Sequence, residues 1–130
     1  MNDTIRVTTF NCKNVKSSVQ EINEMCKSSD VILLQETWLA DYDLSFLSSI
    51  SSDFYAKGIS SVNSSVGVLR GRPHGGLAIL WRKSLECQSR ILTFDDERLL
   101  GLELSVPGET NSKIVFTNVY LPYITRIISK

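Results

Sequence analysis

The segment from Val31 to Trp38, which reads VILLQETW, constrains the fold of this chain more than any other. It begins with four consecutive apolar residues and has no polar alternation, which is typical of a strand buried on both faces. The strand then reaches Glu36, and a carboxylate there is costly unless it is solvated, paired or bound to a cation. Because α/β folds place their chemistry at strand ends, Glu36 is the first candidate metal ligand.

The residues before this segment predict a β-α-β unit. Alternating apolar residues indicate a strand from Ile5 to Asn11. Apolar residues at helical spacing, with Ser18 to Glu21 as a capping box, indicate a helix over Ser17 to Lys27. In such a unit the two strands run parallel, so Asn11 and Glu36 are expected at the same edge of one sheet.

The rest of the chain predicts shorter elements. We expect a short helix over Asp41 to Ile50, a short strand over Asp53 to Ser60 and a long surface loop from Ser60 to Gly75. Beyond Gly76 the pattern indicates an antiparallel meander, with strands over Leu77 to Arg82, Cys87 to Phe94, Arg98 to Val106 and Lys113 to Leu121.

Length and charge limit the classes of protein that this chain can represent. Its 130 residues suit one domain. With 14 basic and 14 acidic residues the formal net charge is zero, so no whole-molecule field draws it onto DNA or a membrane, and any nucleic-acid contact must be local. No apolar run approaches the roughly 18 residues of a membrane span.

The cysteines and the first residues indicate an intracellular setting. The three cysteines are odd in number and far apart, which fits neither a disulfide framework nor a zinc site of paired cysteines. The first residues lack a basic segment followed by an apolar one, so no secretion signal is expected. The nucleus is one compartment open to such a protein.

Three polar strand-end residues each have a structural interpretation that stays open. Asn11 is also suited to capping a turn. Glu36 has candidate partners for a surface ion pair in Arg72, Arg82 and Arg98. Tyr120 is equally compatible with a place in the core and a hydroxyl in water.

A basic, glycine-rich segment runs from Arg70 to Gly76. It contains His74, the single histidine, and is suited to meeting phosphates. Simple exposure to solvent explains the same composition, so this segment by itself does not decide the function.

Five blocks of the sequence together point to a known family. They read TFNCK from Thr9, DVILLQETW from Asp30, GRPHGGLAILWRK from Gly71, ER at Glu97 and TNVYLPY from Thr117. This set resembles the endonuclease/exonuclease/phosphatase superfamily, and GGLAILWRK with NVYLPY looks most like the endonuclease domains of non-LTR retrotransposons. The resemblance implies that residues 1–123 form the N-terminal part of one such domain. Residues 124–130 are then a divergent tail.

The resemblance implies an α+β fold, half of a four-layer α/β/β/α sandwich of the DNase I type. It implies a metal site in which Glu36 and Asn11 hold Mg²⁺ or Mn²⁺. Catalytic roles then fall to Asn11, Glu36 and Tyr120, which would act at the scissile phosphate of DNA. The substrate-binding residues that it implies are Arg72, His74, Arg98 and Asn118.

The sequence also departs from the family pattern. Members of the family continue to a Gly-Asp-x-Asn motif, which orients the attacking water, and to a Ser-Asp-His motif, which contacts the phosphate. Neither motif occurs in these 130 residues. We therefore expect a chain that is not catalytically competent alone, with DNA and a chain supplying the missing half as its partners, and no membrane.

Three functions are thus open at the level of sequence. The first is the N-terminal half of a retrotransposon-type DNA endonuclease. The second is a non-catalytic remnant that binds DNA or protein. The third is a phosphoesterase of the same superfamily, acting on a phosphoinositide or another phosphoester.

Overall fold

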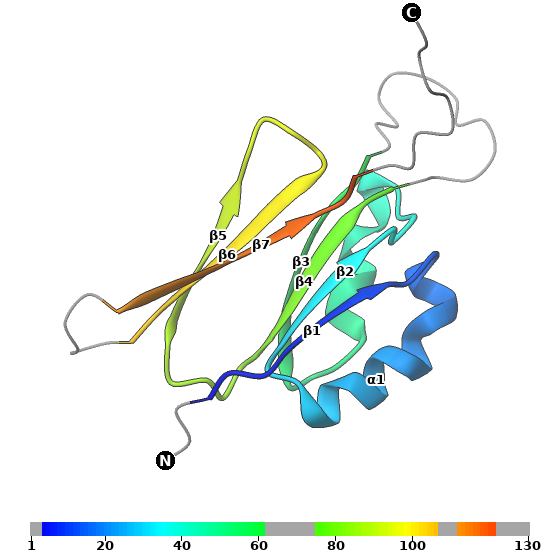
Figure 1. Cartoon of the computed structure of the whole chain (residues 1–130). Coiled ribbons are helices and arrows are strands. Elements are labelled where there is room, and N and C mark those ends of the chain that lie inside the picture. The colour runs from blue at the N-terminus through cyan, green and yellow to red at the C-terminus, as the bar shows by residue number, and fades with distance from the viewer. Residues whose placement is uncertain (1–3, 62–74, 107–111, 122–130) are drawn as a thin grey trace, which may run out of the picture.

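A computed structural model describes residues 4–61, 75–106 and 112–121 of the chain (Figure 1). The elements are β1 (Val7–Asn11), the 3₁₀ helix η1 (Val15–Ser18), α1 (Val19–Ser28), β2 (Val31–Gln35), the 3₁₀ helix η2 (Asp41–Ser49), β3 (Phe54–Ile59), β4 (Leu77–Arg82), β5 (Gln88–Thr93), β6 (Leu99–Ser105) and β7 (Lys113–Val119). Within these ranges, no helix has the length and apolar character needed to cross a bilayer.

Two sheets face each other and helices cover the outer face of one of them. The first sheet has the order β1-β2-β4-β3 and the second the order β5-β6-β7. Figure 1 shows α1 and η2 on the side of the first sheet that is turned away from the second. The predicted α+β class, with helices and two stacked sheets, is confirmed.

The β-α-β unit is also confirmed. Strands β1 and β2 pair in parallel, with Asn11 opposite Gln35. Ile32 and Leu34 of β2 are fully buried in the core under the helices, and Val31 is fully buried in the core between the sheets. The apolar residues of β2 therefore pack into two cores, one on each face of the sheet, as the lack of polar alternation predicts.

The predicted capping box is wrong. The hydroxyl of Ser18 donates to the carbonyl oxygen of Cys12 at 2.9 Å and makes no capping bond to the helix. The helical path already begins at Val15, so Ser18 lies inside it. Asn14 is the cap of this first turn, since its side-chain oxygen accepts the backbone N–H of Lys16 at 3.1 Å.

The predicted four-stranded meander is wrong in its first member. Strand β4 pairs with β2 and β3 in the first sheet, and only β5, β6 and β7 form the meander. Leu77 to Trp81 are all buried, with Ala78 and Leu80 in the core under the helices and Ile79 in the core between the sheets. A strand that is apolar on both sides is stabilised most at the centre of a covered sheet.

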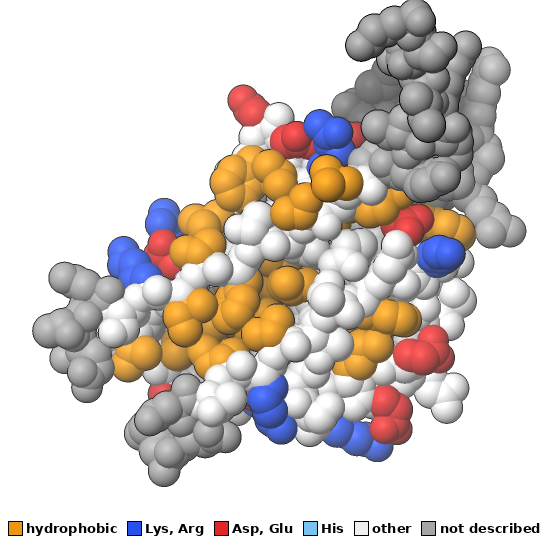
Figure 2. All heavy atoms as spheres, viewed as in Figure 1, with side chains coloured by type: hydrophobic (Ala, Val, Ile, Leu, Met, Phe, Trp, Pro, Cys, Tyr) orange, Lys and Arg blue, Asp and Glu red, His pale blue; other side chains and the backbone are white. Residues whose placement is uncertain are grey.

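One side of the two-sheet stack exposes apolar residues. Strands β1 and β7 are the outer strands of their sheets on this side, and Figure 2 shows apolar side chains gathering between them. The exposed large apolar residues of β1, β7 and the segment just after β7 are Val7, Ile114, Val115, Val119 and Leu121. Open strand edges with apolar neighbours favour pairing with a further strand.

A network of charged side chains lies at the end of the first sheet where β2 begins and β4 ends. The carboxylate of Asp30 accepts the backbone N–H of Arg6 at 2.9 Å and the Nε of Arg82 at 3.2 Å. Burial by itself would raise the pKa of Asp30, but these hydrogen bonds and the nearby guanidinium of Arg6 together lower it. Asp30 therefore stabilises the fold in its charged form.

Replacing Asp30 is expected to lower the free energy of unfolding. Asp30→Asn should lose about 2 kcal/mol at pH 7, because bonds from two guanidinium groups to a charged oxygen are weakened. The folded pKa lies below the unfolded one, so this contribution is complete above about pH 4 and is lost as the pH falls through the folded value. Denaturant unfolding at several pH values measures it.

The control for this experiment is Glu24→Gln, which removes a carboxylate from an exposed pair with Lys27. Its unfolding free energy should match that of the parent within about 0.5 kcal/mol. A loss as large as that of Asp30→Asn, or an Asp30→Asn variant whose deficit persists unchanged in acid, would contradict the assignment.

Candidate functional site

Asn11 and Glu36 lie at one edge of the first sheet, where β1 and β2 end side by side. Backbone hydrogen bonds continue the pairing past the strand ends. The N–H of Cys12 donates to the carbonyl of Gln35 at 2.9 Å, and that of Asn14 donates to the carbonyl of Glu36 at 2.9 Å. The predicted juxtaposition of the two strand ends is confirmed, and it is held by the main chain.

The backbone at this edge is strained. Four non-glycine residues of the described ranges have a positive φ, and all of them follow β1 or β2: Lys13, Asn14, Glu36 and Trp38. Glu36 and Trp38 both have φ at 57°. For an L-residue this conformation costs about 1 kcal/mol or more, and such strain gathers at functional sites. Glu36 is therefore held in a conformation that its own preferences disfavour.

Two glycines brace the turn that follows Glu36. The N–H of Thr37 donates to the carbonyl of Gly76 at 3.2 Å, and that of Trp38 donates to the carbonyl of Gly75 at 2.9 Å. Gly76 has φ at 91°, and a Cβ there would collide with the hydroxyl of Thr37. The Gly-Gly pair before β4 therefore permits a close backbone approach that a side chain would prevent.

The carboxylate of Glu36 is half-buried and forms no ion pair with a described residue. Two of its three candidate partners are engaged elsewhere, because Arg82 binds Asp30 and Arg98 binds Asp96. The predicted surface ion pairs of Glu36 with Arg82 and with Arg98 are therefore wrong. The third, Arg72, lies outside the described residues, as does His74.

Cys12 lies beside Glu36 but has the properties of a core residue. Its thiol is buried and contacts the carbonyl oxygens of Gln35 and Glu36 at 3.3 and 3.5 Å. Burial raises the pKa of Cys12 to about 12, with a smaller contribution from the charge of Glu36. A thiol with that pKa is protonated at neutral pH and is not a nucleophile.

Asn118 links the second sheet to this edge of the first. It is 1% exposed, and its amide nitrogen donates to the carbonyls of Leu34 and Ala78, both at 2.9 Å. Its side-chain oxygen accepts the amide of Gln35 at 2.7 Å. Both amide hydrogens of Asn118 thus bind backbone carbonyls within the protein. The predicted contact of Asn118 with substrate stays a prediction, and it would require these hydrogen bonds to break.

Sequence reasoning missed Gln35 and Thr9. The amide nitrogen of Gln35 also donates to the hydroxyl of Thr9 at 2.9 Å, so it bridges β1, β2 and β7 directly beneath the strand ends. The signal that could have found it is a glutamine closing an apolar strand. A half-buried side-chain amide at such a strand end takes hydrogen-bond partners from neighbouring strands.

Tyr120 and Arg98 lie together at the same end of the second sheet. The backbone N–H of Tyr120 donates to the carbonyl of Arg98 at 3.1 Å. Tyr120 is half-buried against the core between the sheets, two residues beyond Asn118. The exposed guanidinium of Arg98 forms a double hydrogen bond with Asp96 at 3.0 and 3.1 Å, which lowers the pKa of that carboxyl.

The donor set at this edge is compatible with a divalent cation. Among the described residues, no three His, Cys, Asp or Glu side chains gather into a metal-binding group. Glu36 and Asn11 offer a carboxylate and an amide oxygen at adjacent strand ends. Mg²⁺ is typically held by one or two carboxylates together with water and phosphate oxygens, so the chemistry of this pair fits part of such a shell.

The strain at Glu36 predicts an unusual ranking of variants. Glu36→Gly should have a free energy of unfolding about 1 kcal/mol higher than Glu36→Ala, because glycine adopts a positive φ without steric conflict. At Glu24, inside α1, the same pair should rank in the opposite order by about 1 kcal/mol. Denaturant unfolding of the four variants measures both differences. If glycine is also the less stable choice at position 36, the backbone there is not strained.

Solved structures with a similar fold come from several organisms. An AP endonuclease from Leishmania major is 17% identical with a TM-score of 0.68, covering 91% of this chain and 40% of that one. A 3'-5' exonuclease, NExo, from Neisseria meningitidis is 18% identical with a TM-score of 0.56, covering 89% and 41%. TDP2 from D. rerio, complexed with a single-strand DNA product, is 19% identical with a TM-score of 0.54, covering 89% and 45%.

This chain therefore spans less than half the length of each of these structures. At such identities the likeness shows the fold, which is the predicted DNase I-like one. No curated protein matches the chain. The profile of the Endonuclease/Exonuclease/phosphatase family matches residues 8–125, which include both strand ends and the site residues predicted on them. The chain belongs to the Endonuclease/Exonuclease/phosphatase family.

Proposed function

We propose that this chain provides the metal-binding edge of a DNA phosphodiesterase, as the N-terminal part of an endonuclease of the non-LTR retrotransposon type. One observation carries the proposal. The carboxylate of Glu36 sits at a strained strand end beside Asn11, without an ion-pair partner among the described residues. A half-buried carboxylate held in this way is suited to a cation more than to a structural role.

Glu36 and Asn11 are the residues that would hold Mg²⁺ or Mn²⁺. When bound, the metal supplies a Lewis acid that polarises a phosphoryl oxygen and neutralises charge on the leaving group. The chain's own contribution is to fix the two oxygen donors by the backbone bonds that follow β1 and β2. Rigid donors reduce the reorganisation that the reaction would otherwise require.

Tyr120 and Arg98 are the proposed phosphate contacts of the second sheet. The guanidinium of Arg98 is exposed, so it can exchange its bonds with Asp96 for bonds to a phosphate. The contact between Asn118 and Gln35 brings the end of β7 to the strand ends of the first sheet, which supports a shared site. We propose Arg72, His74 and Asn118 as further substrate contacts on the resemblance alone.

DNA is the proposed substrate on two grounds. The GGLAILWRK and NVYLPY blocks resemble retrotransposon endonucleases. Among proteins of the same fold, NExo from Neisseria has been solved with a product DNA hairpin and TDP2 with a single-strand DNA product. Since the net charge of this chain is zero, DNA would be attracted by local groups such as Arg98 and not by the molecule as a whole.

We also propose that these 130 residues do not hydrolyse DNA by themselves. The water-orienting and phosphate-contacting motifs that the resemblance implies are not in the sequence. Loss of such groups typically costs about three or more powers of ten in rate. The open edges of β1 and β7, with their exposed apolar residues, are where a chain supplying the missing half would bind.

Metal binding can be tested without catalysis. Titration of Mn²⁺ followed by electron paramagnetic resonance should show binding to the parent chain and about tenfold or more weaker binding to Glu36→Gln, which is nearly the same size but neutral. Glu24→Gln, an equivalent change on the exposed face of α1, should bind like the parent. Equal affinities for all three proteins would exclude Glu36 as a ligand.

Nicking of supercoiled plasmid in the presence of Mg²⁺ tests the proposed incompleteness. The chain alone should nick no faster than Glu36→Ala, because the groups that orient water are missing. Nicking by the parent that disappears in Glu36→Ala would support the site but refute the incompleteness, and a self-complementing dimer would then explain the activity.

A further inference from the structure

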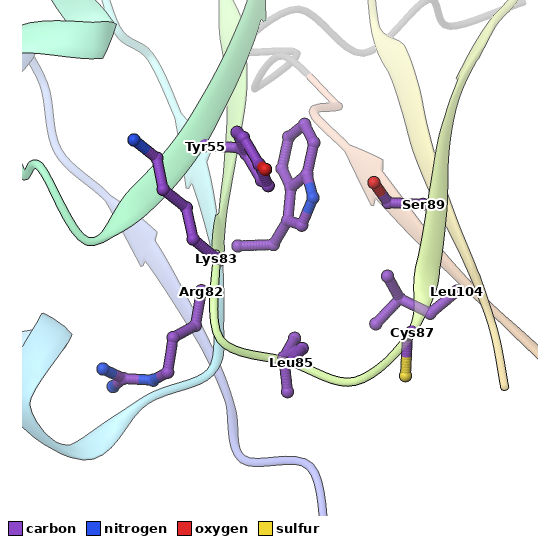
Figure 3. A pocket seen from close by; sticks show the side chains of 8 residues that line it. Tyr55, Arg82, Lys83, Leu85, Cys87, Ser89 and Leu104 are labelled. Carbon is purple, nitrogen blue, oxygen red and sulfur yellow. The ribbon is translucent and has the colours of Figure 1, made fainter. Parts of the chain in front are cut away.

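A concave site lies between the two sheets, at the end away from Glu36. It is a cleft of about 220 Å³, open at one side, between β3 and β4 on one wall and β5 and β6 on the other (Figure 3). Residues with aromatic, cationic, thiol, hydroxyl and aliphatic side chains line it, among them Tyr55, Trp81, Lys83, Cys87, Ser89 and Leu104.

This cleft is separate from the candidate metal site. Trp81 pairs with Val31 at the beginning of β2, whereas Glu36 follows the end of that strand. One strand of this length spans about 15 Å. The cleft also lies on the side of the outer strands β3 and β5, opposite the open edges of β1 and β7. A ligand in the cleft would touch neither Glu36 nor those edges.

One wall of the cleft is aromatic. The rings of Tyr55 and Trp81 lie with their centroids 5.6 Å apart and their planes at 43°. Tyr55 is 49% exposed, as the second residue of β3, the outer strand of its sheet. The exposed part of the Tyr55 ring is a surface on which a planar ring can stack.

A positive charge lies beside the cleft, on the side of Tyr55 turned away from Ser89 (Figure 3). The ammonium of Lys83 lies 5.4 Å from the centroid of the Tyr55 ring, and Figure 3 shows the two side chains next to each other. Lys83 forms no ion pair with a described residue, whereas the neighbouring Arg82 binds Asp30 and the carbonyl of Cys26. Lys83 is exposed, so its flexible side chain can turn from the ring of Tyr55 toward a negative group at the mouth of the cleft.

The inner wall holds an unsatisfied donor. Trp81 is 8% exposed, and its indole nitrogen has no acceptor in the part of the chain that the structure describes. A buried N–H without a partner costs about 1–3 kcal/mol. An acceptor on a bound molecule would recover that cost after a small tilt of the indole ring.

We propose that this cleft binds a small planar aromatic anion, with its ring against Tyr55 and Trp81 and its negative group at Lys83. Leu85 and Leu104 supply an apolar wall, and Ser89 a hydroxyl. Two sources share this chemistry: the base and phosphate of a nucleotide, and the ring and carboxylate of an aromatic acid. The proposal does not depend on the function proposed for Glu36.

The test follows the indole N–H signals of the full chain by ¹⁵N–¹H NMR. The two tryptophans give two signals, which Trp38→Phe assigns without altering the cleft. Thymidine 5′-monophosphate and 4-hydroxyphenylacetate are titrated separately, with thymidine as the uncharged comparison. We expect the Trp81 signal to shift with at least one of the two anions, and the tighter binder identifies the source.

Three variants locate the binding. Tyr55→Ala should weaken binding about tenfold through the loss of stacking. Lys83→Ala should weaken binding of the anion about fivefold and leave thymidine unaffected. Lys27→Ala, which removes an exposed lysine from α1, should bind like the parent. All three changes are at partly exposed positions, so the fold is expected to survive them.

Three results would overturn the proposal. The first is a Trp81 signal that does not move with either anion at millimolar concentration. The second is thymidine binding as tightly as its monophosphate, with 4-hydroxyphenylacetate not binding. The third is equal weakening by Lys83→Ala and Lys27→Ala. Glu36→Gln should leave the titration unchanged, which separates failure of this site from failure of the metal site.

Discussion

The side-chain amide of Asn118 joins the two sheets at the end of the molecule where Glu36 lies. It reaches the carbonyls of Leu34 on β2 and Ala78 on β4, and it receives a hydrogen bond from Gln35. Each of these bonds is worth about 1 kcal/mol net, but an unpaired buried amide would cost more. The polar groups of Asn118 are therefore satisfied only when the two sheets are correctly stacked.

The strained end of β2 comes immediately after this contact in the chain. Gln35 is held by Asn118 and by Thr9, and the next residue, Glu36, takes a positive φ. Backbone bonds to the segment after β1 and to Gly75 and Gly76 hold the turn that follows. The surrounding contacts thus stabilise a conformation that Glu36 would not adopt alone, which is how folded proteins fix a functional group in place.

Local patterns predicted much of this fold. The β-α-β unit follows from the periodicity of residues 5–36, and most strand positions agree with the structure within two residues. The place of β4 was missed because its apolar run indicates burial on both faces without naming its neighbours. The link from Arg82 to Asp30 spans 52 residues, a distance over which periodicity carries no information.

The candidate site was predictable in part. That Asn11 and Glu36 share an edge follows from the parallel strands, but the positive φ of Glu36 depends on the contact with Gly75 and Gly76, far along the chain. Asn118 was expected on the resemblance to contact substrate. Asn118 is buried because the second sheet stacks with this residue of β7 against the first sheet. Sequence patterns do not predict how two sheets stack.

A double-mutant cycle on Asn118 and Gln35 tests most directly whether their amide contact joins the two sheets next to Glu36. The free energy of unfolding is measured for Asn118→Leu, Gln35→Met and the double variant, since these replacements keep the size of the side chains and remove their hydrogen bonds. We expect a coupling energy of about 1 kcal/mol or more between the two positions. Strictly additive losses would show that the amide contact does not join the sheets.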